Sequence, residues 1–111
     1  MRIVFNTKKI QKIFSSEKEL LREYGAEQSK KIQIRLKVLE SAVNLEEVPA
    51  KKPERRHQLK GERKEQFAVD LSHPYRLIFK PAEKPPISDD GGIDLKLVTG
   101  NIIIGVEDYH E

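Results

Sequence analysis

The sequence contains no cysteine, which excludes disulfide bonds, thiolate metal sites and a cysteine nucleophile. Long apolar runs are missing as well. No segment approaches the roughly 18 apolar residues that a membrane-spanning helix needs, and the apolar start "RIVF" is too short for a signal peptide. We therefore expect a soluble protein of the cytoplasm with no membrane partner.

The signatures of common cofactor and metal sites are absent too. The chain has no Walker loop, no GxGxxG and no HExxH motif, and "DDGG" at 89–92 has the composition of a turn. The histidines at 57, 73 and 110 lack the spacing of zinc ligands within any one element, although a site built from all three stays geometrically open. We expect neither a metal nor another cofactor.

What the sequence does contain is the pattern of one α+β domain spanning residues 1–111. Hydrophobic residues make up 37% and charged residues 35%, and the apolar residues recur in regular runs, which argues against disorder. A chain of this length can bury one modest core without a metal or a disulfide.

The first half is predicted to be mostly helical after a short strand at residues 1–5. Asn6 or Thr7 can cap a brief helix that runs through residue 14. Ser16 and Glu19 have the spacing of a capping box, and Gly25 suits the end of that second helix. An apolar stripe then predicts a helix over residues 26–43 that packs on the core; its members are Ile32, Leu36, Leu39 and Val43.

In the second half the apolar period changes to two, which predicts strands. Segments 66–71 and 75–80 are joined by a tight connection, and in the second of them Tyr75, Leu77 and Phe79 share one face while Arg76 lies on the other. Further strands are expected at 93–98 and 102–106, with a turn at residues 100–101. This order favours an N-terminal strand and helical hairpin packed on one face of a twisted antiparallel sheet whose other face is open.

A basic stretch, "KKPERRHQLKGERK" at 51–64, stands between the two halves. A local basic stretch in a chain whose net charge is only +3 indicates a polyanion footprint along one edge. The candidate RNA-binding residues are Lys51, Lys52, Arg55, Arg56, Arg63 and Lys64. A solvated lysine-rich loop explains the same charges equally well.

Histidine and arginine near this stretch suggest a second, chemical possibility. Metal-free RNA cleavage needs a group that deprotonates the 2′-hydroxyl, an acid for the 5′-oxygen and a cation for the phosphorane. The chain offers those residue types at His57, Lys60, Arg76, Asp108, Tyr109 and His110. Histidine suits proton transfer near neutrality, whereas tyrosine better suits base stacking. Each residue also has a structural explanation; in particular, Arg76 can simply pair with Asp70 across a hairpin.

The segment "HQLKGERKEQFAVDLSHPYRLIFKP" at 57–81, followed by "VEDYHE" at 106–111, resembles the HigB-type killer toxins of the RelE-like superfamily. Together "HQLKG", "PYRLIF" and "DYH" in this order are specific, and each alone is weak. The resemblance implies a RelE-like fold. It also implies the toxin of a type II toxin–antitoxin system, a ribosome-dependent endoribonuclease that cleaves mRNA.

The resemblance also implies roles for the matching residues. His57 and Lys60 match H-x-L-K-G and are implied in acid–base chemistry or phosphate contact. Arg76 matches the arginine of Y-R-L-x-F and is implied as the clamp on the scissile phosphate. In the terminal D-Y-H, His110 is implied as the proton-transfer group, with Tyr109 stacking or positioning and Asp108 orienting.

The partners implied by the resemblance are the ribosome, mRNA and a cognate antitoxin, which we expect to be a small helix-turn-helix protein. A catalytically inactive toxin relative, acting as an antitoxin- or RNA-binding module, stays open as the alternative.

Overall fold

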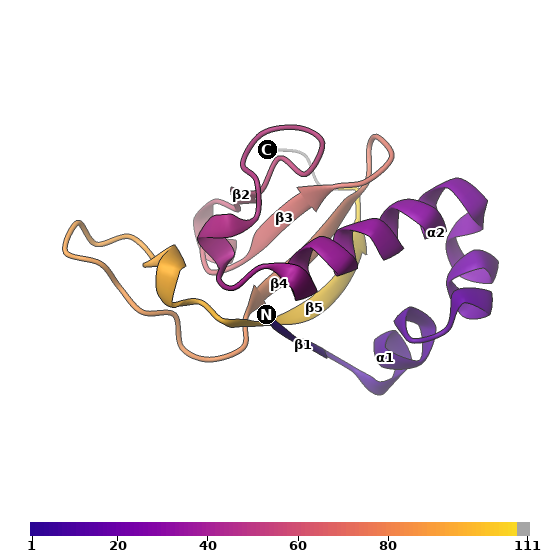
Figure 1. The fold of residues 1–111 in the computed structure, drawn as a ribbon, viewed down its shortest axis with the longest axis horizontal. Helices are drawn as coiled ribbons and strands as arrows, with labels where there is room; N and C mark the ends of the chain where they lie inside the picture. The colour runs from indigo at the N-terminus through magenta and orange to yellow at the C-terminus, as the bar shows by residue number, and fades with distance from the viewer. Residues whose placement is uncertain (109–111) are drawn as a thin grey trace.

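The computed structural model describes residues 1–108 and contains a strand, a helical part and then strands, as the sequence predicts. Figure 1 shows the long helix, Glu17–Ser41, lying across one face of the sheet. The elements of this part of the chain, in order, are β1 (Arg2–Phe5), α1 (Lys8–Phe14), α2 (Glu17–Ser41), β2 (His57–Gln58), β3 (Phe67–Asp70), β4 (Arg76–Pro81) and β5 (Gly100–Glu107), with short 3₁₀ helices at Leu45–Glu47, Gly61–Arg63 and Leu95–Leu97.

The strands of residues 1–108 form one five-stranded sheet in the order β1-β5-β4-β3-β2. Neighbours from β2 to β5 pair antiparallel, but β1 pairs parallel with β5. The sheet is therefore mixed, and the expectation of a purely antiparallel sheet is wrong at this edge. Parallel pairing is possible here because the whole chain between β1 and β5 provides the long connection that it needs.

The helices begin and bend where the local sequence predicts. Thr7 Oγ1 accepts a hydrogen bond of 3.1 Å from the Ile10 amide, and Ser16 Oγ accepts one of 3.2 Å from the Glu19 amide. These caps satisfy amides that have no partner inside a helix. Gly25, at φ 81°, interrupts the helical backbone of α2, so the predicted helix end at this glycine is confirmed as a kink between two helical segments.

The core lies between α2 and the sheet. Ile32 and Leu39 of α2 are fully buried, as are Leu77 and Phe79 of β4, and burying each such side chain stabilises the fold by about 1.5–3 kcal/mol. Val43, expected in the same stripe, is instead 69% exposed. The reason is that α2 ends at Ser41, so residue 43 no longer follows the helical period.

Three predicted features of the second half are wrong. Residues 93–98 do not form a strand, because Asp94 Oδ1 accepts from the Lys96 amide and caps a 3₁₀ helix over Leu95–Leu97. The predicted turn at residues 100–101 is instead the beginning of β5. Tyr75, expected to face the core, precedes β4 and is 43% exposed.

The second face of the sheet, away from the helices, is partly covered rather than open. Leu59, Ala68 and Ile78 are buried there, and Ile104 packs against them. Leu59 belongs to the segment that follows β2, so the connection between β2 and β3 folds over this face.

Candidate functional site

The strand register brings charged side chains together on the second face. Asp70 pairs with Arg76, and Arg76 pairs with Glu107, so the three residues form one row across β3, β4 and β5. His57 pairs with Ala68, two residues before Asp70. Paired residues share a face and alternate along each strand, so His57 lies on the same face as this row.

A bulge in β5 places Glu107 in the row. The pairing register between β4 and β5 shifts between Ile78 and Phe79, and Gly105 occupies the bulge with φ 149°. The extra residue reverses the alternation, which turns Val106 toward the core and Glu107 toward the second face. A positive φ of this kind favours glycine, so a glycine in the last strand helps to build the site.

Arg76 is held by the protein itself. Its Nε lies 2.8 Å from Asp70 Oδ1, and its Nη1 donates to the carbonyl oxygens of Pro74 and Tyr75 at 3.1 and 3.2 Å. Only 14% of the side chain is exposed. The predicted pairing of Arg76 with Asp70 across the hairpin is thus confirmed, while its contact with a phosphate stays a prediction.

Asp70 contacts two further arginines. Arg55 forms a fork with the carboxylate, with Nε 2.9 Å from Oδ2 and Nη2 3.1 Å from Oδ1. The buried Arg35 donates from Nε to the Asp70 carbonyl oxygen at 2.7 Å. Three guanidinium groups thus surround one aspartate, which leaves this end of the sheet with a local surplus of positive charge that favours anions.

Two more arginines of the basic stretch are bound to protein groups. Arg63 forms a fork with Glu107 at 2.8 and 2.9 Å. Arg56 donates from Nε to the Val48 carbonyl oxygen at 2.8 Å, and burial lowers its pKa, an effect that the charge of Glu46 opposes. Of the six residues predicted to bind RNA, Arg55, Arg56 and Arg63 therefore have structural roles.

The remaining predicted residues differ in how the structure places them. His57 is half-buried, and its Nδ1 lies 2.8 Å from the Arg55 carbonyl oxygen, to which it donates. Lys60 is exposed at the start of the 61–63 helix, and Asp108 is exposed directly after β5. Tyr109 and His110 lie outside the described residues. Within residues 1–108, the candidate residues thus lie in two places on the sheet, the His57–Lys60 segment and the Asp70–Arg76–Glu107 row.

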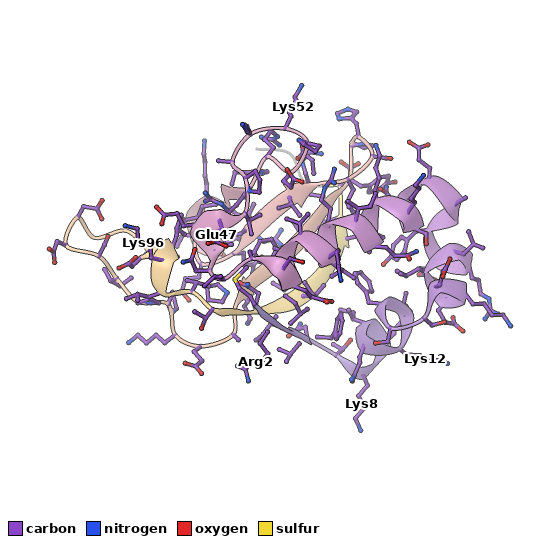
Figure 2. The ribbon with its side chains drawn as sticks, viewed as in Figure 1. Arg2, Lys8, Lys12, Glu47, Lys52 and Lys96 are labelled. Carbon is purple, nitrogen blue, oxygen red and sulfur yellow. The ribbon has the colours of Figure 1, made fainter. Side chains whose placement is uncertain are left out.

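Exposed cations occur on two separate parts of the surface. Lys51, Lys52 and Lys64 are exposed in the basic stretch, which is consistent both with a polyanion footprint and with a solvated loop. A second group was missed; it comprises the exposed Arg2, Lys8, Lys9 and Lys12. Figure 2 shows Arg2, Lys8 and Lys12 projecting on the side opposite to Lys52. The signal was present, because residues 1–16 contain no acid at all.

A hollow in the surface of residues 1–108 lies elsewhere. It has a volume of about 500 Å³ and is lined by Arg2, by Pro81 at the end of β4 and by Gly100 at the start of β5, among others. Arg76 begins β4 and Glu107 ends β5, so the charged row lies at the opposite end of these strands. The charged row therefore does not line this hollow.

Neither the family models nor the curated proteins yielded a match for this chain. Among solved structures, the chain resembles one from the YoeB-YefM complex of Staphylococcus aureus, with a TM-score of 0.55 and 14% sequence identity. The likeness covers 100% of this chain and 98% of the other. It confirms the expected RelE-like α+β fold, and at this identity it does not distinguish the HigB-type branch from others.

Among residues 1–108, none of the helices is long and apolar enough to cross a membrane. Within the same residues, no three histidine, aspartate or glutamate side chains are arranged to hold a metal ion together.

Proposed function

We propose that this chain is the toxin of a type II toxin–antitoxin system and acts in the cytoplasm as an endoribonuclease that cleaves mRNA on the ribosome. The observation that supports this most is the strand register. It brings His57, Arg76 and the residue before Asp108 onto one face of a RelE-like sheet. This register is consistent with a shared site for the first two motifs of the HigB-type resemblance and the start of the third.

The proposed reaction is metal-free attack of a ribose 2′-hydroxyl on the adjacent phosphate. A histidine, either His57 or His110, removes the hydroxyl proton, and the other protonates the departing 5′-oxygen, which leaves a cyclic phosphate and a 5′-hydroxyl. Arg76 and Lys60 stabilise the charge on the phosphorane. Asp108 orients the neighbouring histidine, and Tyr109 stacks on a base.

The held geometry of Arg76 suits this role. A guanidinium whose position is fixed by Asp70 and by two carbonyl oxygens does not have to reorganise when charge develops in the transition state. The three arginines that contact Asp70 add a positive electrostatic potential at the same end of the sheet. Lys51, Lys52 and Lys64, together with the N-terminal cations, provide surfaces for ribosomal RNA phosphates.

The solved neighbour is a complex of YoeB with YefM. By analogy, we propose that the partner of this chain is a cognate antitoxin, a small helix-turn-helix protein that keeps the toxin silent. A small reading frame of that type beside the gene is the inexpensive check.

A second candidate function is supported by a specific observation. Arg55, Arg63 and Arg76 all contact carboxylates of the protein, so these three cations are less available to RNA than the sequence suggests. That arrangement fits a catalytically inactive relative which binds an antitoxin or RNA.

A translation assay with purified ribosomes separates the two candidates. The toxin adds new mRNA 5′ ends within the translated frame and leaves 2′,3′-cyclic phosphate on the upstream fragment, and it does neither when ribosomes are omitted. An inactive relative binds without producing new ends. Products lacking the cyclic phosphate would contradict the proposed chemistry while leaving nuclease activity in place.

A further inference from the structure

We propose that Arg63 and Glu107 form a positioning pair that fixes the end of β5, and with it the start of the D-Y-H segment, relative to the segment carrying His57 and Lys60. The inference rests on the proposed function for its catalytic meaning. In this proposal, Arg63 holds Glu107 in place and does not bind RNA.

The pair has the geometry of a two-point attachment. Nη1 and Nη2 of Arg63 lie 2.8 and 2.9 Å from the two carboxylate oxygens of Glu107. Gln66 Oε1 accepts from Arg63 Nε at 2.8 Å and so fixes the guanidinium from its third side. A forked contact of this kind restrains orientation as well as distance.

The two residues belong to different halves of the candidate site. Arg63 follows Lys60 by three residues in the connection from β2 to β3, and Glu107 is the last residue of β5, directly before Asp108. In the sheet, β3 and β4 lie between β2 and β5. The ion pair thus joins two segments across the second face of the sheet. In the sheet itself, two strands lie between these segments.

The position of Glu107 on this face is itself built into the fold. The Gly105 bulge turns the side chain toward Arg76 and Arg63, and without the extra residue it would point to the core. The bulge thus orients Glu107, and the Gln66 contact orients Arg63, so that the two side chains form a forked ion pair.

A role for Arg63 as a phosphate contact is less consistent with these observations. A phosphate would have to replace Glu107 and approach a carboxylate that repels it. The two roles make opposite predictions for Glu107. Removing its charge frees Arg63 for RNA if Arg63 is a phosphate contact, but releases the end of β5 if the pair is a positioning device.

The test compares Arg63→Ala, Glu107→Gln and the exchange of Arg63→Glu with Glu107→Arg in ribosome-dependent cleavage. Both single variants should lower kcat by roughly 10- to 100-fold with KM changed less than about threefold, because misplacement of catalytic groups affects the chemical step. The exchange should recover most of the activity. A gain of activity or RNA affinity in Glu107→Gln would overturn the proposal.

Matched controls come from an ion pair outside the site. Arg22 and Glu19 pair on α2 at 3.4 Å, and Arg22→Ala and Glu19→Gln should leave kcat and KM as in the wild type. An equal decrease in these controls would mean that the effect comes from general weakening of the fold, and would also overturn the proposal.

A second readout does not depend on activity. Amide hydrogen exchange at Val106 and Glu107 should accelerate about tenfold or more in both single variants and slow again in the exchange variant. Unchanged hydrogen exchange would overturn the proposal whether or not RNA is cut. If hydrogen exchange behaves as expected but the wild type cleaves no RNA, the positioning pair stands and the proposed function fails.

Discussion

Arg76 is paired with Asp70 across the β3–β4 hairpin, with Arg76 Nε 2.8 Å from Asp70 Oδ1. The same carboxylate accepts two hydrogen bonds from the Arg55 guanidinium, and the backbone carbonyl oxygen of Asp70 accepts one from Arg35. Asp70 therefore holds three arginine side chains in place at this end of the sheet. A function based on the charge of Arg76 depends on this aspartate as much as on the arginine.

Replacing Asp70 by asparagine should destabilise the protein by about 1–3 kcal/mol, because two arginines lose their counter-ion. Removing one partner from a fully buried pair costs more, but the Asp70 side chain is 20% exposed, so solvent screens part of the effect. Urea unfolding measures the change, with Asp89→Asn on the exposed loop as the control. Equal midpoints for both variants would contradict the central place given to Asp70.

Gly105→Ala should destabilise the fold and disturb the second face, since φ 149° is unfavourable for a residue with a Cβ. Strain of this type costs about 1–3 kcal/mol. The matched control is Gly100→Ala in the same strand, where an added Cβ would meet only ordinary contacts of 3.4–3.5 Å. Thermal unfolding measures both variants, and a larger destabilisation at Gly100 would be inconsistent with the importance of the bulge.

The N-terminal cations should contribute to ribosome association if the toxin function is right. Reversing Lys8 and Lys12 to glutamate should weaken binding and reduce the slope of log K against log salt, by about one for each phosphate that is no longer neutralised. Sedimentation with ribosomes at several salt concentrations gives that slope. Reversal of Lys30 and Lys37, which are exposed on α2, changes the charge equally. If both double variants reduce the slope equally, net charge and not this surface controls binding.

The loop at residues 82–94 allows a test of pH dependence. Hydrogen bonds from the Ser88 hydroxyl and the Gly92 amide hold the pKa of Asp90 below its usual 3.8. A depressed carboxyl pKa contributes stability that is present above the unfolded pKa and disappears as pH falls through the folded one. NMR titration of Ser88→Ala should therefore show the pKa of Asp90 rising toward 3.8. An unchanged pKa would exclude the serine as the main cause.

Local signals explain most of what the sequence predicted correctly. The caps at Thr7 and Ser16 and the break at Gly25 depend on neighbouring residues alone. The pairing of Arg76 with Asp70 was foreseeable as an alternative because it lies within one hairpin. Val43 was placed wrongly because nothing near it indicated that α2 ends two residues earlier.

Features that depend on distant parts of the chain could not be predicted. Arg63 and Glu107 are 44 residues apart, and only the register across four strands brings them together. Arg63 therefore looked like one more cation of a basic stretch. The parallel pairing of β1 with β5 is likewise a property of the whole fold, and the capped 3₁₀ helix at 95–97 replaced a strand that the apolar alternation had favoured.

The proposal that this surface cleaves RNA is tested most directly by induced expression in a bacterium with mapping of mRNA 5′ ends. Wild type is compared with Arg76→Ala, with His110→Ala and with Lys96→Ala as an exposed control outside the site, and circular dichroism of the purified variants establishes that each is folded. We predict growth arrest and new cuts inside translated frames for wild type and Lys96→Ala. Arg76→Ala should reduce the cleavage rate by about 10²–10³, as for the removal of one transition-state donor. Cleavage by folded Arg76→Ala and His110→Ala at the wild-type rate, or no cleavage by the wild type, would contradict the account.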